Sequence, residues 1–316
     1  YMSYTDITEN EGSFMLCEPS SWGGQWTEEK LDAFEKYVNA YLTIMNSYRD
    51  KYLWELIYFD GFAGSGSRNE TKKETNSPIL QKLFDDTFLK EEELNIYKGA
   101  AERVLSISQR GFDFYYFIDK DKESSLKLHE LLSPFENEKT LVYRNSDANK
   151  QVEMLANAMH RNNNLASLVL LDPFGMQVDW KSIECLKGTR TDLWILIPTG
   201  VIVNRLLDRK GELTHIDKLT SFFGMDEESL KAYFYSKRQV QTLFGEIETV
   251  EKVKQPIQKI ADLYIQQLKG IFEHVTSEPL VLYNSRKTPI FHFACASNNS
   301  SAIKIAHEII DKKRKL

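Results

Sequence analysis

The chain has 316 residues, 42% of them hydrophobic, so it can bury a large core in one elaborated α/β domain. Its formal net charge of −6 excludes nucleic-acid binding through overall charge, so such a contact would need a local basic patch. The three cysteines lie far apart without metal-type or disulfide spacing, which indicates a reduced, cytoplasmic protein. No apolar run approaches membrane-spanning length, so we expect no membrane association.

The N-terminal part divides into an irregular lead-in, residues 1–25, and a helix that starts near Trp26. Apolar residues that include Phe34, Tyr37 and Tyr41 recur at helical spacing after that point. Aromatic residues at this spacing are more typical of core packing than of a cofactor site. The sequence therefore predicts a helix that packs on the domain core.

Strand and helix patterns alternate from there to residue 208. The predicted strands are 55–60, 113–118, 140–144, 166–171 and 192–198. The predicted helices are 77–89, 99–110, 121–132, 148–161, 178–187 and 199–208. Strands separated by helices imply right-handed crossovers, so residues 26–208 predict the core of a doubly wound, mostly parallel α/β sheet.

The pattern changes beyond residue 208. Residues 209–275 are charged and predict a helical insertion. Residues 276–316 predict an antiparallel hairpin, Leu280–Tyr283 with Ile290–Cys295, followed by a helix over 299–313 that completes the core.

The first predicted strand ends in a glycine-rich loop, Asp60-Gly-Phe-Ala-Gly-Ser-Gly66. The loop has no Walker-type Gly-Lys-Ser/Thr, and the third glycine of a dinucleotide fingerprint is missing. An acid before the loop would also repel a pyrophosphate. S-adenosylmethionine has no phosphates and carries an α-amino group and a sulfonium. We therefore expect Asp60, Gly64 and Gly66 to bind the methionine part of that cofactor.

Two further acids follow the next strands. Asp119 ends the second predicted strand, where a ribose diol needs an acceptor, with Asp121 as the alternative ribose ligand. Asp147 follows the third strand and either accepts from an adenine amino group or caps the next helix. Acids at three strand ends in this order favour a nucleoside-bearing cofactor.

At this point the sequence resembles the class I S-adenosylmethionine-dependent methyltransferases and, more narrowly, the three-Cys-motif partner protein family. The resemblance spans roughly residues 26–310. It is carried by Tyr58-Phe-Asp-Gly-Phe-Ala-Gly-Ser-Gly66, Asn76-Ser-Pro78, Leu171-Asp-Pro-Phe-Gly175 with Trp180, and Asp192-Leu-Trp-Ile-Leu-Ile-Pro-Thr-Gly200 with Asn204-Arg205. It implies a methyltransferase fold with S-adenosylmethionine as cofactor and Phe62 among the cofactor-binding residues. The family name also implies a three-cysteine protein partner.

A second loop motif, Asp172-Pro-Phe-Gly175, follows the fourth predicted strand. Methyltransferases that act on exocyclic amines have a similar corner there, in which a carboxylate and a backbone carbonyl accept from the amine and an aromatic ring stacks on the base. Asp-Pro-x-Gly is equally a good type I turn. A single proline before Phe174 departs from the amine-methylating pattern, which puts the base substrate in doubt.

These observations predict a methyltransferase that acts on an exocyclic amine of a nucleobase, with Asp172, Pro173 and Phe174 as the residues that position the acceptor. The substrate is then a nucleic acid. The alternative is a non-catalytic, methyltransferase-like subunit that binds cofactor or nucleotide and serves a partner enzyme. The acidic net charge favours this alternative, because enzymes that act on nucleic acid usually have a basic face.

Overall fold

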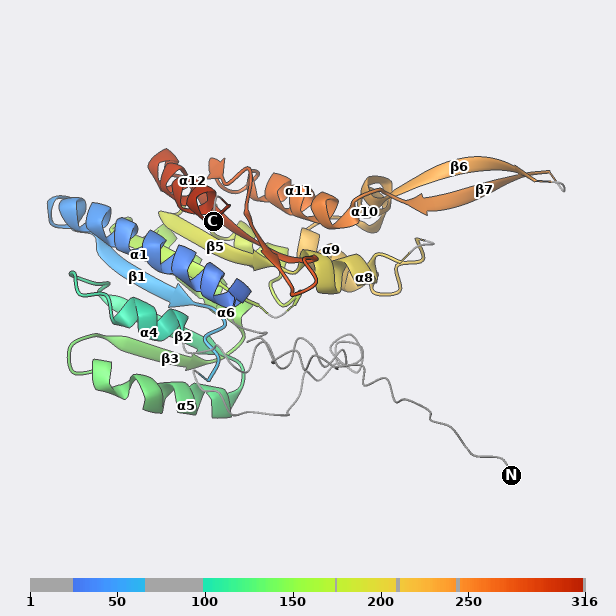
Figure 1. Cartoon of the computed structure of the whole chain (residues 1–316). Coiled ribbons are helices and arrows are strands. Elements are labelled where there is room, and N and C mark those ends of the chain that lie inside the picture. Colours follow the sequence, from blue (N-terminus) through green and yellow to red (C-terminus); the bar gives the residue numbers. More distant parts are fainter. Residues whose placement is uncertain (1–24, 66–98, 174, 209–210, 243–244, 315–316) are drawn as a thin grey trace, which may run out of the picture.

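The structure is a computed structural model that describes residues 25–65, 99–173, 175–208, 211–242 and 245–314 (Figure 1). The described helices and strands are, in chain order, α1 (Gln25–Tyr52), β1 (Glu55–Asp60), α4 (Ala100–Leu105), β2 (Phe114–Asp119), α5 (Lys122–Leu132), η1 (Ser133–Phe135), β3 (Leu141–Asn145), α6 (Ala148–Arg161), β4 (Leu165–Leu171), α7 (Trp180–Glu184), β5 (Thr191–Ile197), η2 (Thr199–Val203), α8 (Asn204–Leu206), α9 (Ile216–Phe223), α10 (Glu227–Phe234), β6 (Tyr235–Thr242), β7 (Gly245–Lys252), α11 (Pro256–Leu268), β8 (His274–Val275), β9 (Leu280–Tyr283), β10 (Pro289–Ser297) and α12 (Ser300–Arg314).

One sheet organises the domain, and among the described residues its strands run in the order β3-β2-β1-β4-β5-β10. Strands β1 to β5 are parallel, β10 is antiparallel to β5, and both β8 and β9 pair with the outer edge of β10. The prediction of a mostly parallel α/β sheet is confirmed. The strand order reverses between β1 and β4, which is the switch point where ligands bind in such sheets.

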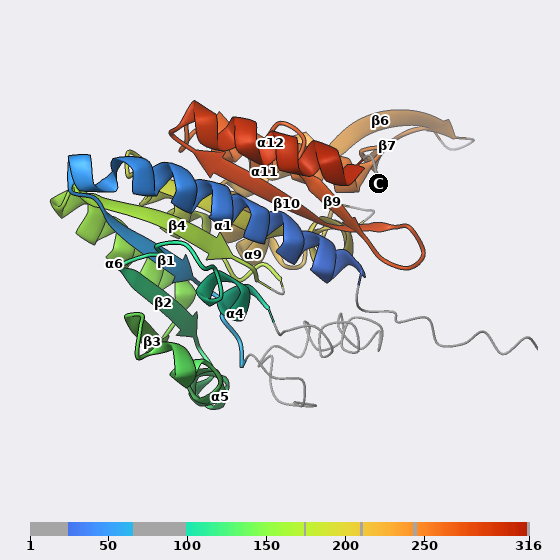
Figure 2. The ribbon, with the colours of Figure 1, turned by 60° about the vertical axis from the view of Figure 1, so that its left-hand side comes forward.

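Helices cover both faces of the sheet. Helices α1 and α12 lie side by side on one face with α4 next to α1, and α9 and α11 lie on the other face (Figure 2). Helix α7 contacts α9. This two-sided cover explains why β1 reads as a continuous apolar run, since only its first residue is exposed. The predicted helix over 77–89 lies outside the described residues.

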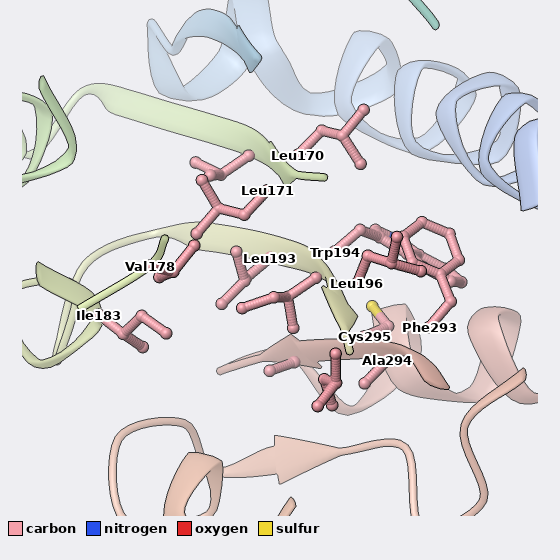
Figure 3. Close-up of a cluster of buried hydrophobic side chains, with 14 of the residues drawn as sticks. Leu170, Leu171, Val178, Ile183, Leu193, Trp194, Leu196, Phe293, Ala294 and Cys295 are labelled. Atoms are coloured by element: carbon pink, nitrogen blue, oxygen red, sulfur yellow. The ribbon is translucent and has the colours of Figure 1, made fainter. Parts of the chain in front are cut away.

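The core is continuous from the sheet into α1. Figure 3 shows buried side chains of β4, β5 and β10 in contact around Trp194, which is fully buried. From α1, the Phe34 ring meets Trp194 edge-on at 6.3 Å between centroids, and the Tyr37 ring does so at 5.1 Å. The aromatic stripe predicted from helical spacing is therefore core packing, and it holds α1 in a defined register over the sheet.

The expected helical insertion, residues 209–275, contains α9, α10 and α11 but also an antiparallel hairpin, β6 with β7. Figure 1 shows this hairpin extending away from the sheet domain. The prediction of a mostly helical segment is therefore wrong for residues 235–252, where it expected no strand. Charged side chains pair across the two strands of the hairpin, as Lys237 does with Glu248 at 2.8 Å. The hairpin therefore lacks the alternating apolar face by which strands are usually recognised in a sequence.

The base of this hairpin is tied to the sheet domain. The Lys252 ammonium donates to the backbone carbonyls of Asn204 and Leu207 at 2.7 and 2.5 Å. The Tyr235 hydroxyl donates to the carbonyl of Asp208 at 2.7 Å. The base of the hairpin is thus bonded to residues 204–208, which follow β5 at the carboxyl edge of the parallel strands.

The C-terminal part agrees with its prediction. Strands β9 and β10 form the expected hairpin, and α12 packs next to α1. The structure adds the short strand β8 at the edge of the sheet. No helix in the described part of the chain has the length and apolar character needed to cross a membrane.

Gly224 ends α9 in the left-handed region, with φ of 64°, directly against Trp180. A Cβ at this position would lie 2.0 Å from the Trp180 ring, and that ring is held by edge-on packing against Tyr264 at 5.5 Å. We expect Gly224→Ala to lower the free energy of unfolding by about 2–4 kcal/mol, through backbone strain and overpacking together. Urea denaturation followed by circular dichroism measures this.

Gly188 provides the matched control. It also has a positive φ, 76°, but nothing lies within 4 Å of its ideal Cβ. Gly188→Ala therefore reports the backbone strain alone and should cost about 1 kcal/mol. Equal losses in the two variants would contradict the steric role assigned to Trp180.

Candidate functional site

The five parallel strands end at the same edge of the sheet, and an acid closes or directly follows three of them. Asp60 closes β1 and pairs in register with Phe117 of β2 and Leu170 of β4. Asp119 closes β2, and Asp172 directly follows β4. The parallel register therefore brings together acids that are more than a hundred residues apart in sequence, as the sequence predicted.

The glycine-rich loop after β1 bridges the neighbouring strands through its backbone. The Gly61 amide donates to the Leu170 carbonyl at 3.0 Å, and the Ala63 amide donates to the Ile118 carbonyl at 2.9 Å. The Gly64 amide then donates to Oδ2 of Asp119 at 2.9 Å, with φ of 63°. The predicted glycine and the predicted ribose ligand are thus in direct contact. Gly66 lies outside the described residues.

Asp60 is almost completely buried, 3% exposed. Its Oδ1 accepts from the Phe62 amide at 3.2 Å, and the Tyr58 hydroxyl lies 3.4 Å from its Oδ2. Burial raises the pKa of Asp60 to about 7, and the negative charge of Asp172 acts in the same direction. The carboxyl group therefore changes its charge near neutral pH.

Asp172 forms a buried ion pair with Lys30 of α1. The Lys30 ammonium lies 2.5 Å from Oδ2 of Asp172, and the two residues are 4% and 8% exposed. The same ammonium stands 5.4 Å from the centre of the Trp26 ring. The sequence prediction left Asp172 without a partner, so Lys30 is a site residue that it missed.

Helix α1 places Lys30 by packing on both sides of it. Trp26, one turn before Lys30, stacks on Phe291 at 5.2 Å, and Phe34, one turn after it, packs on Trp194. Residues four apart lie on the same helix face, so Lys30 stands in the middle of a buried aromatic stripe. A lysine at that spacing was the signal in the sequence, because lysine is rarely buried without a partner.

Asp119 and its neighbour Asp121 have separate roles. Oδ1 of Asp119 accepts from the Asp121 amide at 2.7 Å, and burial raises the pKa of Asp119. Asp121 caps α5, where its Oδ1 accepts from the Ser124 amide at 2.7 Å. Of the two acids predicted for a ribose, Asp119 is therefore the one in contact with the glycine loop.

Asp147 caps α6, where its Oδ1 accepts from the amides of Asn149 and Lys150 at 3.0 and 3.4 Å. The structure therefore supports the helix-capping alternative for this residue. Pro173 is buried beside Asp172, and Phe174 lies outside the described residues. The histidine of β10, His292, is buried and bonded to Thr199 at 2.8 Å, so it belongs to the core.

A narrow pocket opens beside the ion pair. It is lined by Lys30, Asp60 and Asp172, by Phe62 of the loop, and by Thr27 and residues of α4 and α5. Its cavity volume is about 30 Å³, room for a single water molecule.

No protein-family model matches this chain, and no curated protein matches it. The resemblance described by its motifs therefore stays a prediction.

The charges beside the pocket are mostly acidic in the described part of the chain: Asp60, Glu102 and Asp172 line it, together with Lys30. A phosphate backbone is attracted by lysine and arginine clusters. The described residues thus offer carboxylates to a cation or an amine, rather than a basic track for nucleic acid.

Proposed function

We propose that the chain is an S-adenosylmethionine-dependent methyltransferase whose acceptor is an exocyclic amine of a nucleobase. The observation that carries this proposal is the convergence of the glycine loop with Asp119 and Asp172 at the switch point of the sheet. The strand order 3-2-1-4-5 with an antiparallel strand beyond β5 supports the same fold class.

The residues present fit the chemical groups of this cofactor. Asp60, in its ionised form, would accept from the α-ammonium group, and the positive φ of Gly64 lets the backbone approach a ligand closely. Asp119 already accepts from two backbone amides, and each carboxylate oxygen retains a lone pair for a ribose hydroxyl. When bound, the cofactor supplies an electrophilic methyl carbon on its sulfonium.

The chain's own contribution to transfer is positioning. The Asp172 carboxylate and the Pro173 carbonyl would accept hydrogen bonds from the acceptor amine and so direct its lone pair. Holding two reactants in line is worth effective molarities of about 10⁵–10⁸ M in favourable cases. The ion pair with Lys30 involves Oδ2 of Asp172, so release from Lys30 would leave both carboxylate oxygens to the amine.

The second candidate, a non-catalytic subunit that serves a partner protein, is favoured by the β6–β7 hairpin. A two-stranded hairpin that stands away from the domain offers unpaired strand edges to another chain. Its three basic and three acidic residues balance, and Lys237 pairs with Glu248, so it has no net charge with which to hold nucleic acid. These features suit a protein partner better than a phosphate backbone.

The proposed cofactor site is tested by isothermal titration calorimetry with S-adenosylmethionine. We expect the wild type to bind and Asp119→Ala to bind at least about tenfold more weakly, because a hydrogen bond to a charged group contributes about 1.5–3 kcal/mol. The control is Asp121→Ala, which removes a helix cap but no group in contact with the glycine loop, and it should bind like the wild type.

Absence of binding by the wild type would contradict the proposal. A loss in Asp121→Ala with binding retained in Asp119→Ala would move the ribose contact to Asp121. An assay with methyl-labelled cofactor then distinguishes the methyltransferase from the non-catalytic subunit. Label that enters RNA or DNA supports the methyltransferase. Cofactor binding without transfer to either supports the subunit.

A further inference from the structure

Three buried ionisable side chains from separate parts of the chain are among the residues that line the pocket: Asp60 at the end of β1, Asp172 after β4 and Lys30 of α1. Each is less than one-tenth exposed. Two carboxylates with one ammonium match a zwitterion, which brings one cation and one anion. The amino-acid end of S-adenosylmethionine is such a group, with its α-ammonium and α-carboxylate.

We propose that Lys30 is a cofactor-operated latch: its ammonium leaves Asp172 for the α-carboxylate of the bound cofactor, and Asp172 is thereby freed to receive the methyl acceptor. This inference rests on the proposed function and extends it, since Lys30 lies outside the glycine loop and the Asp-Pro-Phe-Gly corner. It predicts an order of events in which the cofactor binds before the acceptor.

The geometry allows this exchange without movement of α1. Trp26 and Phe34 fix the helix one turn to each side of Lys30. The lysine carries a single charged group on a flexible four-carbon stem, so its head can change partner while the backbone stays in place. In the structure, the ion pair lies beside a cavity of about 30 Å³ that opens to solvent, so a ligand can reach the Lys30 ammonium from the pocket side.

Electrostatics favour an exchange of partners over simple opening. A buried ammonium that lost Asp172 without a replacement would be strongly destabilised. A cofactor carboxylate replaces the lost anion, while Asp60 receives the ammonium. A ligand shifts a conformational equilibrium only by its differential affinity for the two states. Here the two states are Lys30 paired with Asp172 and Lys30 released from it, and the α-carboxylate of the cofactor binds only the released state.

The test compares two ligands that differ in this group. S-adenosylmethionine carries the amino-acid end, whereas 5′-methylthioadenosine keeps the adenosine and thioether but lacks it. We expect Lys30→Met to weaken S-adenosylmethionine binding at least about tenfold in calorimetry. The same variant should bind 5′-methylthioadenosine within about twofold of the wild type, which also shows that it is folded. Lys36→Met, an exposed lysine of the same helix, should change neither affinity.

A second variant tests the exchange itself. In Asp172→Asn, a neutral amide replaces the carboxylate that is paired with Lys30, so S-adenosylmethionine should bind at least about threefold more tightly than to the wild type. Unchanged or weaker binding by this variant would overturn the latch. So would a loss in Lys30→Met that is equal for both ligands, or no loss at all. Failure of the wild type to bind either ligand would instead overturn the proposed function.

Discussion

Replacing Asp172 by alanine is expected to lower the free energy of unfolding by about 3–5 kcal/mol, because the change leaves the Lys30 ammonium buried without a counter-charge. Lys30 is 4% exposed, and Asp172 is the carboxylate paired with its ammonium. Urea denaturation at pH 7.5, followed by circular dichroism, measures the loss. It would amount to a large fraction of the stability of a typical domain.

The double variant Lys30→Met with Asp172→Leu should recover most of this loss, because apolar groups of similar volume often replace a buried ion pair at little cost. The exposed pair Arg110–Asp50, 2.8 Å apart, provides the control. Asp50→Ala should cost less than about 1 kcal/mol, as is typical of surface pairs. A similar small loss in Asp172→Ala would show that the Lys30 pair is solvated, and would remove the basis for the latch.

Asp60 is expected to make the protein less stable as the pH rises from about 4 to about 7. Its pKa is raised from 3.8 to about 7 by burial, so the folded state holds a proton in this range that the unfolded state has released. Stability is therefore highest at the acidic end and falls through the folded pKa. A shift of about three pH units corresponds to about 4 kcal/mol at 1.36 kcal/mol per unit, as an upper bound.

Asp60→Asn should remove this dependence and make the protein more stable than the wild type above pH 7. The measurement is the difference between the two unfolding free energies at several pH values from 4 to 8. Burial also raises the pKa values of Asp119 and Asp192, and their contributions cancel in the difference. Parallel curves for wild type and variant would show that Asp60 is ionised throughout and that its surroundings are polar.

The two predictions above, on the Lys30–Asp172 pair and on the pKa of Asp60, concern residues of the proposed cofactor site. The ammonium group of the cofactor would pair with the ionised form of Asp60. In the structure, burial favours the protonated form of Asp60 at pH values below about 7. Ligand binding would then release a proton from Asp60 as it moves Lys30 away from Asp172.

The central parallel strands β1, β4 and β5 were predictable because their residues are buried on both sides. Strand β1 is mostly apolar and ends in Asp60, and the mostly apolar strand β4 is followed by Asp172. Each buried residue must be apolar whichever strand or helix covers it, so the apolar run can be recognised in the sequence without knowledge of the neighbouring elements. The C-terminal hairpin was equally visible, because Asn284 to Thr288 carries turn residues between two apolar runs.

The β6–β7 hairpin was not predictable in the same way. Its strands have charged and amide side chains, with Lys237 and Glu248 paired across the ladder, and no buried face imposes an apolar alternation. Charged residues of this kind are also common on helix surfaces. What holds the hairpin is cross-strand pairing and the anchoring of its base by Lys252, neither of which is a local property of the chain.

The sequence by itself determined the parallel strands β1 to β5, the C-terminal hairpin, the acids that follow the strands and the glycine loop after β1, because burial periodicity and turn chemistry are local. Only the tertiary structure decided what those acids do. It buries Asp60 beside Asp172, makes Asp147 a helix cap, and brings Lys30 across 142 residues onto Asp172. The charge of a carboxyl group and its freedom to bind depend on burial and on the nearest opposite charge, and both are set by packing between distant segments.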